Sequence, residues 1–334
     1  MLAQLGLSLL PVLVFLFGLQ LIDTYKLLRL RRVLITVAAG GAIGLLCYGL
    51  NTGVLALGRV SPDTWAATGA PVLEEGLKAL YVLWLLRRGR LGFMVDAAIT
   101  GFAVGAGFAL IENLVYLPAI SNAGLATAAV RGFGTAMMHG GTTAIFGLVS
   151  IQRIEIRGFR GVRALTPGLA IAIFIHVLYN LNLLPPAISA AVLLVVLPVV
   201  LSLIFWYSET ALKKWVGTKL DKDIELLQMI ATGTLSTSRA GKFLRALENS
   251  FDPVVLGDML CYLQISLELS AQAKGDLLRR EMGFPVTADP ALPGRLTELV
   301  YLEKRIGRAG KLALSPLLGS SRRDIWEIYQ LSER

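Results

Sequence analysis

The sequence predicts an all-α polytopic membrane helix bundle of about seven transmembrane helices, followed by a C-terminal helical soluble domain. Of the 334 residues, 55% are hydrophobic and only 16% are charged, whereas soluble globular chains carry about 25% charged residues. The mean hydropathy is +0.65. Stretches near twenty residues long with almost no charge, such as 2–22 and 187–206, match a hydrocarbon core about 30 Å thick.

The apolar runs define the expected spans in chain order, and each is long enough for a helix to cross a bilayer. The first run has no basic segment before it and no small-residue cleavage site after it, so we expect it to remain as a helix rather than act as a signal peptide. The membrane domain then covers residues 1–207. The spans are residues 2–23, 33–57, 69–86, 93–117, 127–151, 165–184 and 187–206.

Basic residues between the spans predict the orientation, because cytoplasmic connectors carry the excess of Lys and Arg. The connectors after the first, third and fifth spans hold eleven of them, against Arg59 alone in the opposite connectors. The N-terminus is therefore expected outside and the C-terminal tail inside. The eleven residues are Lys26, Arg29, Arg31, Arg32, Arg87, Arg88, Arg90, Arg153, Arg157, Arg160 and Arg163.

The net charge of +9 does not indicate a nucleic-acid partner. Residues 1–207 hold 14 Lys and Arg against 7 Asp and Glu, and residues 208–334 hold 18 against 16. The excess thus follows membrane topology rather than a basic stripe. The two cysteines, Cys47 and Cys261, exclude a disulfide scaffold and a cysteine-based zinc site.

Residues 208–334 have the composition of a small soluble domain. Apolar and charged residues alternate at helical spacing in 242–248, 254–280 and 296–308. Glycine and proline at 283–290 break this pattern, so a loop is expected there. We predict a helical cytosolic domain of unknown role, which binds a cytosolic partner or stabilises the membrane domain.

Charged side chains within the spans are the strongest functional signal. Each costs on the order of 2.5–3.5 kcal/mol at mid-bilayer, so six of them facing lipid would cost roughly 15–20 kcal/mol. That exceeds the stability of a typical protein. They must therefore face one another or a wet cavity inside the bundle, together with both histidines of the chain. The set is Glu74, Glu75, Lys78, Asp96, Glu112, Arg131, His139 and His176.

The rise of 1.5 Å per residue gives approximate depths for this set. Glu75 and Glu112 would lie about 9 Å below the outer surface, His176 about 13 Å and His139 about 18 Å. Asp96 lies near the inner end of its span and can reach the interface. His176 and Asn180 share a helix face. The cluster is thus expected in the outer half of the bilayer, open to the extracytoplasmic side.

Several chemistries suit a cluster of carboxylates and histidines. A glutamate can activate water while His and Asn donors stabilise an oxyanion. Alternatively, His139, His176 and a glutamate such as Glu112 can bind zinc, although no HExxH motif is present. A serine or aspartyl mechanism lacks its motif. A transporter or a non-catalytic scaffold remains the competing class; no inverted repeat supports a transporter.

Four motifs in register carry a resemblance to a known family. They are E-E-x-x-K at 74–78, G-F-x-x-x-E-N-x-x-Y at 107–116, R-x7-H from Arg131 to His139, and H-x-x-Y-N at 176–180. In this order, over about residues 69–185, they resemble the PrsW family of intramembrane proteases. That family is distantly similar to the CAAX prenyl endopeptidase and bacteriocin-immunity superfamily.

The resemblance implies an intramembrane endopeptidase, with 1–207 as its transmembrane protease domain, in a bacterial plasma membrane. The implied substrate is a single-pass membrane protein, such as an anti-sigma factor, cleaved near its extracytoplasmic side. Similarity to the CAAX enzymes makes Glu75 or Glu74 the water-activating base. His139 is its partner, and His176 and Asn180 are the oxyanion donors. Glu112 joins this set, and Lys78, Asn113 and Arg131 support it. We favour this metal-free mechanism, with zinc as the alternative.

Overall fold

The computed structural model describes most of the chain as helix, and the described residues contain no β-strand. The chain divides into two compact units, Met1–Glu209 and Thr210–Arg334. The described residues are 10, 13–18, 21, 29–120, 124–157, 162–287, 289–318, 326–328, 330 and 331.

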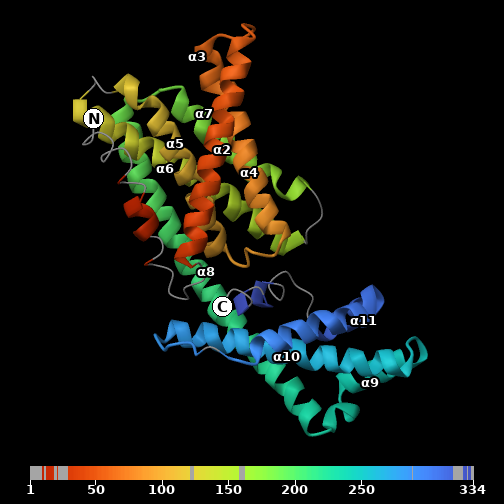
Figure 1. Cartoon of the computed structure of the whole chain (residues 1–334). Helices are drawn as coiled ribbons and strands as arrows, with labels where there is room; N and C mark the ends of the chain where they lie inside the picture. The colour runs from red at the N-terminus through yellow and green to blue at the C-terminus, as the bar shows by residue number, and fades with distance from the viewer. Residues whose placement is uncertain are drawn as a thin grey trace. The chain divides into compact units, whose positions relative to one another are not determined.

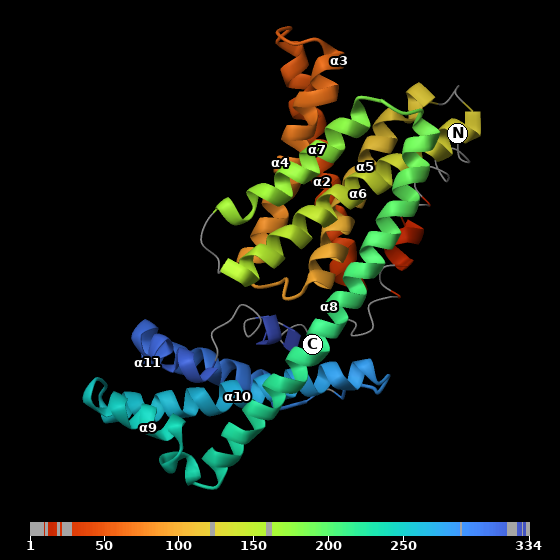
Figure 2. The ribbon, with the colours of Figure 1, turned by 180° about the vertical axis from the view of Figure 1, so that it is seen from behind.

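The first unit is a helical bundle (Figure 1). A short α3 (Pro62–Thr64) and a π-helical turn, Trp65–Gly69, lead without a break into α4. Seen from behind, α7 runs beside both α4 and α6 (Figure 2). The long helices are α2 (Leu30–Ala56), α4 (Ala70–Arg87), α5 (Met94–Ile120), α6 (Gly124–Arg157), α7 (Thr166–Asn180) and α8 (Pro186–Ala231).

Helix α5 is the centre of this bundle, and 83% of its most apolar stretch is buried. Glycines let its neighbours approach to backbone contact, as is common between membrane helices. A Cβ at Gly105 would lie 2.0 Å from the carbonyl oxygen of His139 on α6. A Cβ at Gly107 would lie 1.9 Å from that of Val37 on α2. Helix α5 is thus tightly packed on both sides.

Most of the expected spans agree with helices of the bundle within a few residues. Spans 33–57, 69–86, 93–117 and 127–151 correspond to α2, α4, α5 and α6. The first span, 2–23, lies mostly outside the described residues. Span 165–184 is too long, because α7 ends at Asn180 and the positive φ of Asn182 (49°) turns the chain before two prolines.

The last helix differs most from the prediction. Helix α8 does not end at 206 but continues to Ala231, because the charged stretch after 207 is itself rich in helix-forming residues. Among the described residues, four helices are long and apolar enough to cross a membrane by length and hydropathy alone: α2, α5, α8 and α10 (Pro253–Glu281). Helices α4 and α6 do not meet this criterion; they carry the charged and small polar residues that are discussed below.

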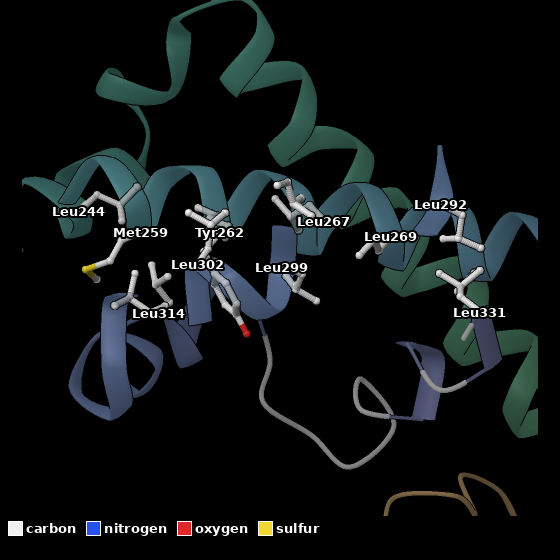
Figure 3. Packing of buried hydrophobic residues seen from close by; sticks show 14 residues of the cluster. Leu244, Met259, Tyr262, Leu267, Leu269, Leu292, Leu299, Leu302, Leu314 and Leu331 are labelled. Carbon is white, nitrogen blue, oxygen red and sulfur yellow. The ribbon is translucent and has the colours of Figure 1, made fainter. Parts of the chain in front are cut away.

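The second unit is built on the pairing of α10 with α11 (Leu292–Leu318), with α9 (Arg239–Ala246) at one end. Figure 3 shows the leucines of α10 and α11 facing one another. The loop expected at 283–290 lies between these two helices. Helix α11 extends further than predicted, with a kink at Gly307 (φ 64°). Val254 and Leu260 of α10 remain exposed.

A buried lysine links three segments of the second unit. Lys274 on α10 donates to Asp223 on α8 (2.7 Å) and to Glu327 near the C-terminus (3.0 Å). Ser270 also accepts from it at 2.5 Å. All three ammonium protons of Lys274 therefore have acceptors. We interpret its role as structural, because it holds these three segments together.

The packing of α5 gives a test of the fold. We expect Gly105→Ala to lower the free energy of unfolding by about 1–3 kcal/mol, because the new methyl overlaps the His139 carbonyl. Gly49→Ala on α2 is the matched control, since nothing lies within 4 Å of a Cβ there. Thermal unfolding of the detergent-solubilised variants measures both. Equal melting temperatures would contradict the tight α5–α6 contact.

Candidate active site

Helix α4 presents two charged residues to the interior of the bundle. Glu75 and Lys78 are 2% and 0% exposed, whereas Val72, Leu80 and Trp84 on the other face are 53%, 60% and 42% exposed. The i,i+3 spacing brings the Lys78 Nζ within 2.5 Å of the Glu75 Oε1. The helix therefore buries an ion pair of its own, as its sequence predicted.

Glu75 also connects α4 to two other helices. His176 Nδ1 of α7 lies 2.8 Å from Glu75 Oε1, and the Thr142 hydroxyl of α6 donates to it at 3.2 Å. A carboxylate only accepts, so the proton of this imidazole lies on Nδ1. The other nitrogen, Nε2, then keeps its lone pair. It faces Glu74 Oε2 at 3.8 Å.

The second histidine, His139, carries its proton on the other ring nitrogen. Lys78 Nζ lies 3.0 Å from His139 Nδ1, and an ammonium group only donates. His139 must therefore accept at Nδ1 and carry its proton on Nε2. That N–H donates to Glu112 Oε2 of α5 in a short hydrogen bond. Thus His176 presents an acceptor and His139 a donor, and their rings are 4.8 Å apart, edge to face.

Arg131 and Glu112 form the more exposed edge of the cluster. Their side chains are 32% and 26% exposed, and Arg131 Nη2 lies 3.5 Å from Glu112 Oε1. The guanidinium stacks over the Tyr116 ring at 4.2 Å. Within the described parts of the chain, the Arg131 Nε–H is buried and has no hydrogen-bond partner. It is a donor available to a ligand.

Glu74 is held from a direction that the sequence did not reveal. Asn51 of α2 donates to Glu74 Oε1 at 2.9 Å, and Trp65 Nε1 donates to Asn51 Oδ1 at 3.0 Å. The side chain of Glu74 is 13% exposed. Its ion-pair partner among the described residues is His176 rather than a lysine or arginine. Of the three carboxyl groups, Glu74 therefore has no lysine or arginine ion-pair partner among the described residues.

Hydrogen bonds to two other helices hold the π-helical turn before α4. Trp65 bonds Asn51, and the next residue, Ala66, accepts a hydrogen bond from the Asn180 side chain (2.9 Å) through its carbonyl. A π-turn departs from α-helical hydrogen bonding and is frequent at functional sites. Here it lies beside Glu74 and is held by α2 and α7.

The structure brings most of the expected site residues together. Glu74, Glu75, Lys78, Glu112, Arg131, His139 and His176 form one connected cluster. Asn113 is buried next to Glu112 on α5. The pairing differs from the expectation, however. Glu75 contacts His176, while His139 contacts Glu112.

One expected site residue lies apart from the cluster, and two others were missed. Asn180 directs its amide to Ala66 rather than to the histidines. Asp96, which was not expected in the site, is fully buried and accepts from the backbone N–H of Gly92 (2.9 Å), so it caps the start of α5. Asn51 and Thr142 went unnoticed. The polar amide in an apolar span, and the i+3 spacing of Thr142 from His139, were the available signals.

Comparison with protein families identifies the bundle. A model described as "PrsW family intramembrane metalloprotease" matches residues 29–206, more than half of the chain. The chain belongs to the PrsW family. The match is longer than the 69–185 segment that carries the motifs, and it includes α2 with Asn51. Curated proteins and solved structures gave no significant match.

The PrsW description raises the question of a metal. Glu74, His139 and His176 each offer one ligand atom, and these atoms lie within 4.8 Å of one another. Two histidines and a glutamate are a known zinc set. The carboxylate in this set is Glu74, whereas the sequence suggested Glu112. The second carboxylate, Glu75, orients His176 as outer partners of metal ligands do.

In the PrsW site, the hydrogen bonds leave a lone pair available for a metal on only two of these three residues. Glu74 and His176 Nε2 each keep a lone pair toward the centre. His139 does not, because Nδ1 accepts from Lys78 and Nε2 carries the proton given to Glu112. Lys78 also places a positive charge beside the would-be ligand. In this pairing, His139 would have to give up the hydrogen bond to Lys78 or to Glu112 before it could bind zinc.

The Lys78–Glu75 pair gives a test that is independent of activity. Lys78→Met leaves Glu75 as a buried charge without its cation, so we expect a loss of about 3–5 kcal/mol in the free energy of unfolding. Combining it with Glu75→Gln removes both charges and should restore a large part of the loss. A double-mutant cycle of thermal unfolding measures the coupling. Additive losses would mean that the two groups do not interact.

Proposed function

We propose that this PrsW-family protease is an intramembrane endopeptidase that uses Glu74 and His176 to activate water, without a metal. The opposite polarity of the two histidines supports this assignment most directly. His176 presents a lone pair fixed by Glu75, and His139 presents an N–H fixed by Lys78. Hydrolysis of an amide needs a proton acceptor and a donor at such positions.

The acceptor side is the gap between Glu74 and His176. Their facing atoms are 3.8 Å apart, too far for a direct hydrogen bond and suited to a shared water. That water would donate one hydrogen bond to each, and as its oxygen attacks the carbonyl carbon of the substrate it would transfer one proton to Glu74. Glu74 is the proton acceptor in this proposal, because it has no lysine or arginine partner among the described residues, while Glu75 is neutralised by Lys78.

The donor side is His139 with Arg131. The His139 Nε2–H and the Arg131 Nε–H can stabilise the oxygen that becomes negative as the carbonyl is attacked. For this, Glu112 shifts from His139 toward Arg131, which already lies 3.5 Å from its other oxygen. Glu74 then returns the proton to the amide nitrogen, the C–N bond breaks, and the products are a carboxylic acid and an amine, which exchange a proton to give a carboxylate and an ammonium group.

The setting of this site is part of the same proposal. The apolar runs, the distribution of basic residues and the outer-half depth of the charged residues favour seven transmembrane helices with the active site open to the extracytoplasmic side, and the resemblance to PrsW proteases favours a bacterial plasma membrane. The substrate would be a single-pass membrane protein, such as an anti-sigma factor. The second unit would be a cytosolic domain whose Lys274 network stabilises it and which binds a cytosolic partner.

A zinc-dependent version of the protease is the second candidate. It is favoured by the spacing of Glu74, His139 and His176 and by the metalloprotease description of the family. A bound zinc would lower the pKa of a coordinated water and polarise the substrate carbonyl. His139 could join as a ligand only after losing either the Lys78 or the Glu112 hydrogen bond.

The base assignment is tested by Glu74→Gln. We expect it to abolish cleavage, because an amide cannot take the proton, while the melting temperature stays within a few degrees of the wild type. The measurement is a comparison of new N-termini in membrane proteins from cells that produce each variant. Asp63→Asn, an exposed carboxylate on α3, is the matched control. Wild-type cleavage by Glu74→Gln would exclude Glu74 as the base.

Metal content separates the two candidates. We expect the purified protein to lack stoichiometric zinc and its cleavage to persist in a zinc chelator, because His139 has no lone pair available. Elemental analysis of the wild type, Glu74→Ala and His139→Ala measures this, with Cys47→Ala as a control outside the cluster. About one zinc per chain in the wild type and in Cys47→Ala, lost in Glu74→Ala and His139→Ala, would establish the zinc-dependent version instead.

A further inference from the structure

Gly69, the last residue of the π-helical turn, determines where the Trp65 ring lies. A Cβ at Gly69 would lie 2.2 Å from the Cε3 atom and 2.3 Å from the Cζ3 atom of this indole. The ring therefore lies against the Cα of Gly69, in space that the side chain of any other residue would need. In this position its Nε1–H donates to Asn51 Oδ1 of α2 at 3.0 Å.

The indole determines the orientation of the Asn51 amide. An indole N–H only donates, so it must face the amide oxygen, and the NH2 group of Asn51 then faces Glu74. Asn51 Nδ2 donates to Glu74 Oε1 at 2.9 Å, while Glu74 Oε2 faces His176 Nε2 at 3.8 Å. A flipped amide would present its oxygen to Glu74, which suits a protonated carboxyl group and not a carboxylate. Trp65 thus keeps a donor on the carboxylate oxygen that does not face His176.

The backbone of the π-turn explains why the turn is also attached to α7. The N–H of Ala70, which an α-helix would direct to the Ala66 carbonyl, donates to the Trp65 carbonyl instead. The next residue, Pro71, has no N–H to offer. The Ala66 carbonyl accepts from the Asn180 side chain of α7. The position of Trp65 is therefore held by the turn as well as by Gly69.

We propose that Trp65 and Asn51 are positioning residues for the reaction: they hold the Glu74 carboxylate in the orientation in which it shares a water with His176. Both act through Glu74, so the inference rests on the proposed role of Glu74 as the base. Without the Asn51 N–H, the carboxylate can rotate about its terminal torsion, which has broad energy wells. A displacement of about 1 Å at a reacting group lowers a rate by about 100-fold.

Three variants disturb this pair in different ways. Asn51→Leu removes both hydrogen bonds with a side chain of similar size, and Trp65→Phe removes only the indole N–H. Gly69→Ala keeps every hydrogen-bonding group but pushes the ring aside. We expect cleavage to fall about 100-fold in Asn51→Leu and about tenfold in the other two, with melting temperatures within a few degrees of the wild type.

The rate of cleavage is measured as the appearance of new N-termini in membrane proteins after each variant is induced in cells. Gly53→Ala on α2 is the matched control for Gly69→Ala, because nothing lies within 4 Å of a Cβ there. The double variant Asn51→Leu with Trp65→Phe should cleave no more slowly than Asn51→Leu alone, since Trp65 acts through Asn51. If the two losses multiply, Trp65 does not act through Asn51 and the inference is wrong.

A second measurement does not depend on cleavage. The indole N–H signals of isotope-labelled tryptophan are recorded by NMR in the detergent-solubilised protein, and Trp65→Phe assigns one of the five. We expect the Trp65 signal to move in Asn51→Leu and in Glu74→Gln but to stay in place in Gly53→Ala. A signal that is unchanged in Asn51→Leu would show that the indole does not bond to Asn51.

The failure of this inference differs from the failure of the proposed function. Wild-type cleavage by Trp65→Phe and Gly69→Ala, with Glu74→Gln inactive, would overturn the positioning role and leave Glu74 as the base. Wild-type cleavage by Glu74→Gln would overturn both. These two variants also decide the matter if Asn51→Leu does not fold.

Discussion

The ammonium group of Lys78 is the contact on which the arrangement of the site depends. It is fully buried, donates to Glu75 and His139, and lies 4.8 Å from the centre of the Phe108 ring. Because it can only donate, it determines which nitrogen of His139 carries a proton. Through Glu75 it also supports the carboxylate that determines the protonation of His176. One lysine thus assigns opposite roles to two otherwise equivalent imidazoles.

This cluster is possible only because the surrounding helices pack at backbone distance. The same residue, His139, places its side chain in the cluster and its carbonyl against Gly105 of α5. A larger residue at 105 would separate α5 from α6 and with them Glu112 from His139. In a bilayer, where lipid is as apolar as the helix surface, such small-residue contacts and interhelical hydrogen bonds are what holds helices together.

The sequence was informative where spacing along one helix decides a contact. The Glu75–Lys78 pair and the presence of both histidines in one cluster follow from helical periodicity and from the cost of charge in lipid. It was less informative where rotation of one helix against another decides. Whether Glu75 meets His139 or His176 depends on the rotation of α4 against α6 and α7, which no single-helix pattern encodes. Asn51 stands out as an amide in an apolar span, but its contact with Glu74 depends on the same kind of rotation, here of α2 against α4.

Local composition also failed at two helix ends. The apolar run ends at 206, but hydrophobicity and helicity are separate properties, and α8 continues through charged residues that favour helix. Asn180 shares a face with His176, yet its amide meets a backbone carbonyl that only the π-turn exposes to it.

That π-turn has a consequence for insertions and deletions. It contains one residue more than an α-helical turn would need between α3 and α4, and one residue of an α-helix corresponds to a rotation of about 100°. A relative lacking a residue within Trp65–Gly69 would therefore present a different side chain to Asn51 and a different carbonyl to Asn180. We therefore expect related chains to keep the length of this short segment more strictly than its residue types.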